Sequence, residues 1–167
     1  MPIKIRPARL AEISSLDDAT NANVRLGGYD MDKLFSVSEI ECFHLELTYE
    51  DVHRIFLLHE TTFIPHTKDG TCKIVDILST AEEMAMSRLL SGTKNELDLS
   101  VTTAREPVFV TTNVAKNPFV AIDGNHRLTA HFARHRSVNG VKAFVAVHKR
   151  MFDWHFIPPL ARELATA

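Results

Sequence analysis

The segment FVAIDGNHRLTAHF, residues 119–132, joins two structural patterns at a single turn. Its first residues are mostly apolar and predict a strand that ends at Asp123. The residues after Gly124 are typical of a helix, so the chain passes from strand to helix within one turn. Such a turn is either an ordinary connection or a place where an anion binds.

Further strands are predicted on both sides of this segment. EPVFVTTN (106–113) and PFVAID (118–123) are separated by a short connection, which favours a two-stranded hairpin. VKAFVAVHKR (141–150) has apolar residues on both faces, which is typical of a strand in the middle of a sheet. The segment 119–132 therefore leaves a sheet and enters a helix that packs beside it.

The residues between 41 and 71 show three successive patterns. In ECFHLEL (41–47) apolar and other residues alternate, which predicts a strand. Every second side chain of that strand points to the same face, and those on one face are Phe43, Leu45 and Leu47. Residues 49–60 follow helical spacing, and Thr48 with Asp51 forms a variant of the capping box at the start. Residues 61–71 are predicted to be extended and turn-like, because they contain a proline and an Asp-Gly pair.

Two more helices complete the prediction. Ser79 or Thr80 opens a helix over AEEMAMSRLLS that ends at Gly92, and Pro159 begins a short helix within IPPLARELA. The polar stretch 17–33 is expected to be a surface loop or a short helical piece. The fold class that follows is α+β, with a small mixed sheet flanked by helices.

Composition indicates one domain without disulfides. The chain has 167 residues, 45% of them hydrophobic, a formal net charge of −2 and two cysteines, Cys42 and Cys72. That length and hydrophobic content support a single core. The slightly negative net charge does not indicate a protein whose whole surface binds nucleic acid without sequence preference. Neither cysteine has a CxxC partner, so both are interpreted as reduced core thiols.

No stretch approaches the roughly 20 apolar residues of a membrane span, and the N-terminus lacks a signal-peptide pattern. We expect a cytoplasmic protein with no membrane partner.

The turn at residues 123–127 is the candidate site. Turn amides, the first free N–H groups of a helix and a cationic side chain meet there, which is an arrangement that attracts phosphate. Gly124 allows a positive φ and a close approach of the backbone, and Arg127 offers a bidentate fork. Asp123 or Asn125 would cap the helix, and an ionised Asp123 could instead bind a metal that accompanies phosphates. His126 could add a donor.

The segment FVAIDGNHRLTAHF resembles the signature of the ParB/sulfiredoxin-like superfamily, in which a strand ends in a Gly-x-x-Arg turn and enters a helix. Upstream EPVFVTT and downstream VKAFVAV are similar to strands of the same family, so that the resemblance covers residues 74–148. It implies a single ParB/sulfiredoxin-like domain that binds ATP or a related nucleotide, with Mg²⁺. The residues expected to bind the nucleotide are Gly124, Asn125, His126, Arg127 and Thr129. Those expected to act in catalysis are Asp123, His126 and Arg127, with Asp123 as metal ligand.

The sequence departs from the family at two points. Sulfiredoxin-like enzymes have a cysteine within the motif, where this chain has Asn125, which argues against that chemistry. Chromosome-partitioning members continue into a helix-turn-helix domain, whereas this chain ends about 40 residues after Arg127. The tripeptide NVR at 23–25 only faintly resembles a box near the N-terminus of the family.

Three functions are compatible with these residues. The first is a nucleotide-binding phosphohydrolase or phosphotransferase with a DNA-processing role, for which Glu82, Glu83 and Asp123 are candidate general bases. The second is a non-enzymatic module that binds a protein or nucleic acid, and the third is a metal-dependent nuclease.

Several basic residues would form a patch that binds a polyanion if they converge in the fold. They are Arg127, His131, Arg134, Arg136, His148, Lys149 and Arg150. His131 and His135 are spaced to share an ion, although a solvated helix face is the favoured interpretation, because no third ligand is apparent from spacing.

Overall fold

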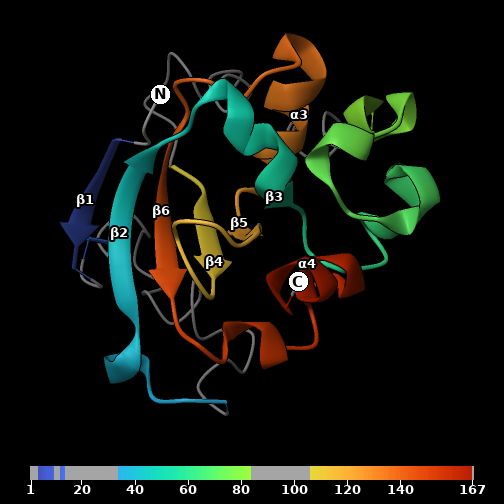
Figure 1. Ribbon diagram of the computed structural model, residues 1–167. Coiled ribbons are helices and arrows are strands. Elements are labelled where there is room, and N and C mark those ends of the chain that lie inside the picture. Colours follow the sequence, from blue (N-terminus) through green and yellow to red (C-terminus); the bar gives the residue numbers. More distant parts are fainter. Residues whose placement is uncertain (1–3, 10–11, 14–33, 84–105, 167) are drawn as a thin grey trace, which may run out of the picture.

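A six-stranded mixed sheet forms the centre of the protein (Figure 1). The computed structural model describes residues 4–9, 12–13, 34–83 and 106–166. The strands are β1 (Lys4–Ala8), β2 (Glu41–Glu46), β3 (Ile55–Phe56), β4 (Val108–Thr111), β5 (Phe119–Asp123) and β6 (Lys142–Val147). Their order across the sheet is β1-β2-β6-β4-β5-β3. The α+β class predicted from the sequence is confirmed.

The pairing of β6 confirms that it is a central strand. It runs antiparallel to β2 and parallel to β4, and four of its six residues are buried. Strands β4 and β5 form the predicted antiparallel pair, with an irregularity between Val108 and Phe109. Strand β3 adds to the far side of β5 in parallel, so the carboxyl ends of β3 and β5 lie at the same edge.

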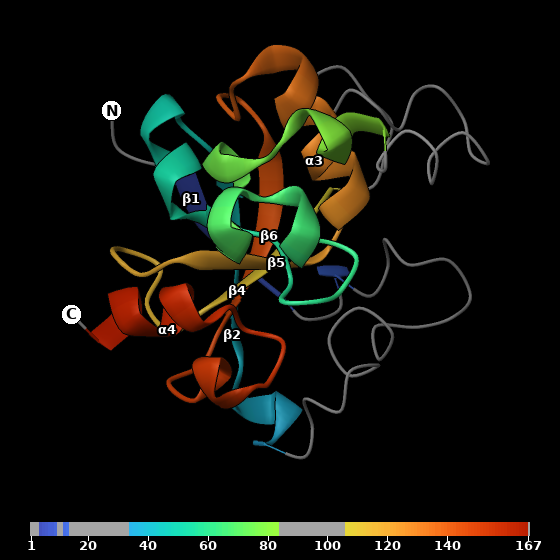
Figure 2. The same ribbon diagram turned by 90° about the vertical axis from the view of Figure 1, so that its right-hand side faces the viewer.

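In the described ranges, α-helices and a series of short 3₁₀ helices lie beside the sheet. The α-helices are α3 (Asn125–His135) and α4 (Pro159–Thr166), both at predicted positions. The 3₁₀ helices are η3 (Val37–Glu39), η4 (Tyr49–Arg54), η5 (Ile64–His66), η6 (Lys68–Gly70), η7 (Ile74–Asp76) and η9 (Met151–Asp153). Seen from the β3 side, the turns of residues 49–83, α3 and α4 stand in front of the sheet (Figure 2). The described residues contain no helix with the length and hydropathy that crossing a bilayer requires.

The core is built from residues of the sheet and of the elements around it. Phe56, Phe109 and Phe119 are fully buried, and Trp154 is 2% exposed, so it packs in the core. Cys42 and Cys72 are buried free thiols, as the sequence predicts. Burial raises the pKa of each thiol to about 11, which keeps both protonated and unreactive near neutral pH.

The helix predicted over residues 49–60 is wrong beyond Arg54. Its first part is the 3₁₀ helix η4, whose start has the predicted capping arrangement: the Asp51 carboxylate accepts from the Thr48 amide at 2.6 Å. Ile55 and Phe56 then leave the helix and pair with Phe119 and Val120 of β5. Helical spacing and a buried edge strand give the same short apolar run, and pairing with β5 decides between them.

One other prediction needs correction, one is confirmed and two fall outside the described residues. Residues 61–71 are turn-like but not extended, because they contain η5 and η6. The strand predicted over 41–47 is confirmed as β2, in which Cys42, on the opposite face from Leu45, is also buried. Residues 79–83 are helical as predicted, whereas the rest of that helix and the stretch 17–33 lie outside the described residues.

Candidate functional site

The junction between β5 and α3 is a tightly packed turn around Gly124. This glycine is the N-cap of α3 and has a φ of 83°, in the left-handed region that side chains disfavour. A Cβ at this position would lie 3.0 Å from Arg127 Nη2 and 3.1 Å from Pro107 Cβ. Glycine is therefore required both for the backbone conformation and for the packing of Pro107 against the turn.

Asn125 holds this junction together from inside. Its Oδ1 accepts from the amide of Leu58 at 3.1 Å, and its Nδ2 donates to the carbonyl of Ala121 at 2.9 Å. The Thr129 hydroxyl, fully buried, donates to the Asn125 carbonyl at 2.7 Å. Both residues are predicted nucleotide contacts, and in the structure their side chains fix the shape of the turn; nucleotide binding by them stays a prediction.

Arg127 and Asp123 bring opposite charges to the start of α3. The Arg127 side chain is only 9% exposed, and its Nη2 lies 3.8 Å from Asp123 Oδ2. At that distance the pair interacts through charge rather than through a close hydrogen bond. The first turn of the helix contains no acidic residue, and its glycine N-cap has no side-chain oxygen that could accept from the first-turn amides. The buried guanidinium and the helix dipole thus place positive potential at one point.

His126 faces the loop that follows β3. It is partly exposed, and its ring lies 5.2 Å from the ring of Phe63 between centroids. The same loop contains His59, whose amide donates to the Phe156 carbonyl, and Glu60, whose pKa is raised by burial. Because β3 and β5 are parallel, the residues that follow both strands gather at one edge, where α/β proteins commonly bind ligands.

Sequence reasoning missed that the loop after β3, which contains His59, Glu60 and Phe63, contacts the turn. The misassigned helix over 49–60 places His59 and Glu60 at the end of a helix instead of beyond a strand. The signal that could have found them is the run IFLL at 55–58, which is short, apolar and rich in residues that favour strands.

The histidine pair on α3 has no third metal-ligating side chain grouped with it among the described residues. The rings of His131 and His135 lie 4.6 Å apart between centroids, but His131 is 3% exposed, so the solvated helix face that the sequence favours is wrong for His131. In the described parts of the chain, no three His, Cys, Asp or Glu side chains are grouped to hold a metal ion. Asp123 could supply a single carboxylate to a metal that arrives with a phosphate ligand.

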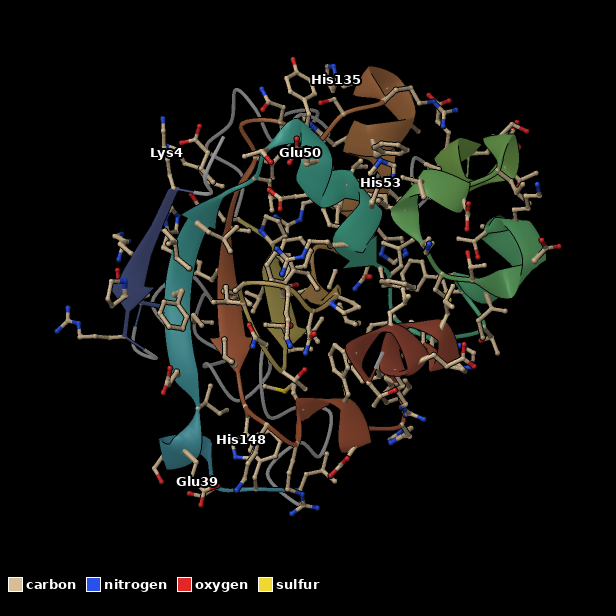
Figure 3. All side chains as sticks on the ribbon, viewed as in Figure 1. Lys4, Glu39, Glu50, His53, His135 and His148 are labelled. Carbon is tan, nitrogen blue, oxygen red and sulfur yellow. The ribbon has the colours of Figure 1, made fainter. Side chains whose placement is uncertain are left out.

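The basic residues between positions 127 and 150 do not converge on one patch. Arg134 and Arg136 are exposed near the end of α3 close to His135, whereas His148 follows β6 at the opposite end of the molecule (Figure 3). His148 is buried: Nε2 lies 3.1 Å from Glu39 Oε2 and Nδ1 accepts from the Arg150 amide. A polyanion lying across all these residues is not supported.

The other candidate general bases lie apart from the turn in sequence. Glu82 and Glu83 are exposed within the helical residues 79–83. The NVR tripeptide at 23–25, which faintly resembles a box of the family, lies outside the described residues. Asp123 is the candidate base that lies at the junction itself.

Comparisons of the chain with protein-family models, with curated proteins and with solved structures find no match. The relation to the ParB/sulfiredoxin-like superfamily therefore stays a hypothesis that rests on the residues of the turn and its flanking strands.

Proposed function

We propose that the chain is a ParB/sulfiredoxin-like protein that binds the phosphates of ATP or a related nucleotide at the β5–α3 junction. One observation carries the proposal. The Arg127 guanidinium, 9% exposed, lies in the first turn of α3 beside a left-handed glycine, so a buried cation and the positive end of a helix coincide. An anion at this point would be stabilised by both.

The proposed roles follow from where each group lies. The amides of the first turn and Arg127 would bind phosphate oxygens, and His126, which is partly exposed, would add a donor from the side of Phe63. Asp123, whose side chain is 20% exposed, would contribute one carboxylate to a Mg²⁺ ion that enters with the nucleotide. When bound, that ion neutralises charge on the phosphates.

Phosphohydrolase or phosphotransferase activity is the reaction class we propose for this site. Fixed amides and Arg127 would stabilise the charge of the transferring phosphoryl group. Glu60 is the group we propose to accept a proton from the attacking hydroxyl, because burial raises its pKa and its loop is tied to the start of α3.

A thermal-shift screen against nucleoside mono-, di- and triphosphates, with and without Mg²⁺, tests the proposal. Saturating nucleotide at about 100 times its Kd should stabilise the fold by about 2.7 kcal/mol, a rise in Tm of several degrees. Phosphate release from the nucleotide that binds best then measures the reaction. If no nucleotide changes the Tm while DNA binds in a salt-dependent manner, the protein is instead an interaction module.

Two substitutions on α3 distinguish a residue that binds the nucleotide from one that does not. Because Arg127 is buried, Arg127→Lys is preferable to alanine: it keeps the charge and the stem but removes the planar fork. We expect it to weaken nucleotide binding more than tenfold in titration calorimetry. Arg134→Lys, exposed on the same helix, is the matched control and should bind as the wild type does. Equal affinities for both variants would contradict the assignment.

A further inference from the structure

A pocket lined mainly by charged residues lies on the sheet itself, across β1, β2 and β6. It is an open hollow of about 290 Å³ lined by Lys4, Ile5, Arg6, His44, Glu46 and Lys142. The strand register explains its composition. Lys4, Glu46 and Lys142 are direct neighbours across the three strands, and Arg6, His44 and Phe144 form a parallel row two residues further on. Residues two apart on a strand share a face, so both rows line the same side.

The lining carries three positive side chains and one negative one. Glu46 lies 3.9 Å from Lys4 and is the single acid of the lining, whereas Arg6 pairs with Glu12 at 3.0 Å. Lys142 forms no ion pair within the described residues. Lys4 and Arg6 each have an acidic partner, so Lys142 is the cation of the lining that remains for an anion, on a strand that flanks the strand of His44.

His44 is oriented at the floor of this pocket by Glu106. Its Nε2 lies 2.8 Å from Glu106 Oε2, and its ring makes an edge contact with Phe144 at 4.8 Å between centroids. Because an ionised carboxylate only accepts, Nε2 carries the proton, and in the neutral ring Nδ1 is then an acceptor. The side chain is 18% exposed and lines the hollow, so the ring of His44 lies in the same pocket as the cations.

We propose that this pocket binds inorganic phosphate. Inorganic phosphate has the two properties that the lining requires: charged oxygens for Lys142, and a P–OH that can donate to Nδ1 of His44. Sulfate has the charge without the donor, and acetate has a single charge and a flat shape. The pocket is separate from the β5–α3 junction and does not depend on the nucleotide site proposed there.

Chemical-shift mapping of the full-length protein tests the proposal. Inorganic phosphate, methyl phosphate, sulfate and acetate are titrated at pH 7 and equal ionic strength. We expect saturable shifts at residues 4–6, 44–46 and 142 with inorganic phosphate, and at least fivefold weaker binding of sulfate. Methyl phosphate, which at pH 7 is mostly a dianion without a P–OH, should bind as weakly as sulfate. Shifts confined to residues 123–127 would instead support the nucleotide site and overturn this one, as would equal affinity for sulfate.

Two variants locate the effect. Lys142→Gln should weaken phosphate binding at least fivefold, and Lys68→Gln, an exposed lysine of η6, should leave it unchanged. His44→Leu should abolish the preference for phosphate over sulfate, because the acceptor is removed. If His44→Leu loses a native spectrum, the Lys142 variant and the phosphate-to-sulfate ratio of the wild type still decide. Unchanged binding by Lys142→Gln would overturn the proposal.

Discussion

The backbone amide of Leu58 donates a hydrogen bond to Asn125 Oδ1 at 3.1 Å and so ties the loop after β3 to the first turn of α3. The two residues are 67 positions apart in the chain, and both are buried. Asn125 also donates to the carbonyl of Ala121, so one side chain joins the end of a strand, the start of a helix and a second loop. The candidate site is consequently shaped by an internal amide rather than by the residues that face solvent.

Replacement of Asn125 by alanine should destabilise the protein strongly. The change leaves a buried N–H and a buried C=O without their partners, at a cost of about 2–4 kcal/mol in the free energy of unfolding. Asn139→Ala, at an exposed position, should change that free energy by less than about 0.5 kcal/mol. Urea unfolding measures both variants. A small effect at Asn125 would show that the two loops do not depend on this side chain.

Gly124→Ala and Gly140→Ala separate strain from crowding. Both glycines have φ near 80°, but a Cβ at Gly124 would contact Pro107 and Arg127, whereas a Cβ at Gly140 would meet nothing within 4 Å. Gly140→Ala should therefore cost about 1 kcal/mol from the left-handed backbone alone. Gly124→Ala should cost about 2–4 kcal/mol, because crowding adds to the same strain. Equal losses in urea unfolding would mean that Pro107 moves aside freely.

Arg54→Lys should reveal how far the β4–β5 connection depends on a planar guanidinium. Arg54 donates to the carbonyls of Val114 and Asn117 at 2.8 and 2.7 Å, and it lies 4.1 Å above the ring of Phe119. A lysine cannot make these contacts together, so the loss should be about 1–3 kcal/mol by urea unfolding. Arg150→Lys, at an exposed ion pair with Asp153, should lose less than about 1 kcal/mol. The proposed role is contradicted if the two variants are equally stable.

The two thiols should resist alkylation while the protein is folded. With the pKa of Cys42 and Cys72 raised to about 11 by burial, the thiolate fraction at pH 8 falls by about a hundredfold relative to an unfolded chain. Iodoacetamide labelling, with and without urea, measures the ratio. Rapid labelling of the native protein would contradict the burial of these groups.

The same thiols give stability a defined pH dependence. An unfolded thiol ionises near pH 9 and a folded one near pH 11, so the unfolded chain loses its protons first. The stability contributed by these groups is fully present below about pH 9 and is lost as the pH rises through about 11. A Cys42→Ala, Cys72→Ala double variant should lose less stability than the wild type between these pH values in urea unfolding. Parallel pH profiles for the two proteins would exclude the effect.

Local patterns predicted most of the elements around the turn. Short-range signals, namely apolar runs, turn residues and helix starts, predict four of these features. They are the hairpin of β4 and β5, the central position of β6, the start of α3 after Gly124 and the start of α4 at Pro159. These signals suffice because each depends on residues close together in the chain. The same reasoning identified the junction at 123–127 as the place where a strand meets a helix.

Only the tertiary structure decided what lies around that junction. Ile55 and Phe56 form a strand because β5 offers a free edge beside them, which no local pattern encodes. Asn125 and Thr129 turn inward because their hydrogen-bond partners come from the loop after β3 and from the strand and helix backbone. The pairing of His44 with Glu106 likewise joins positions 62 residues apart. The sequence by itself determined where strand becomes helix, whereas contacts between distant residues determined which side chains hold that turn and which face a ligand.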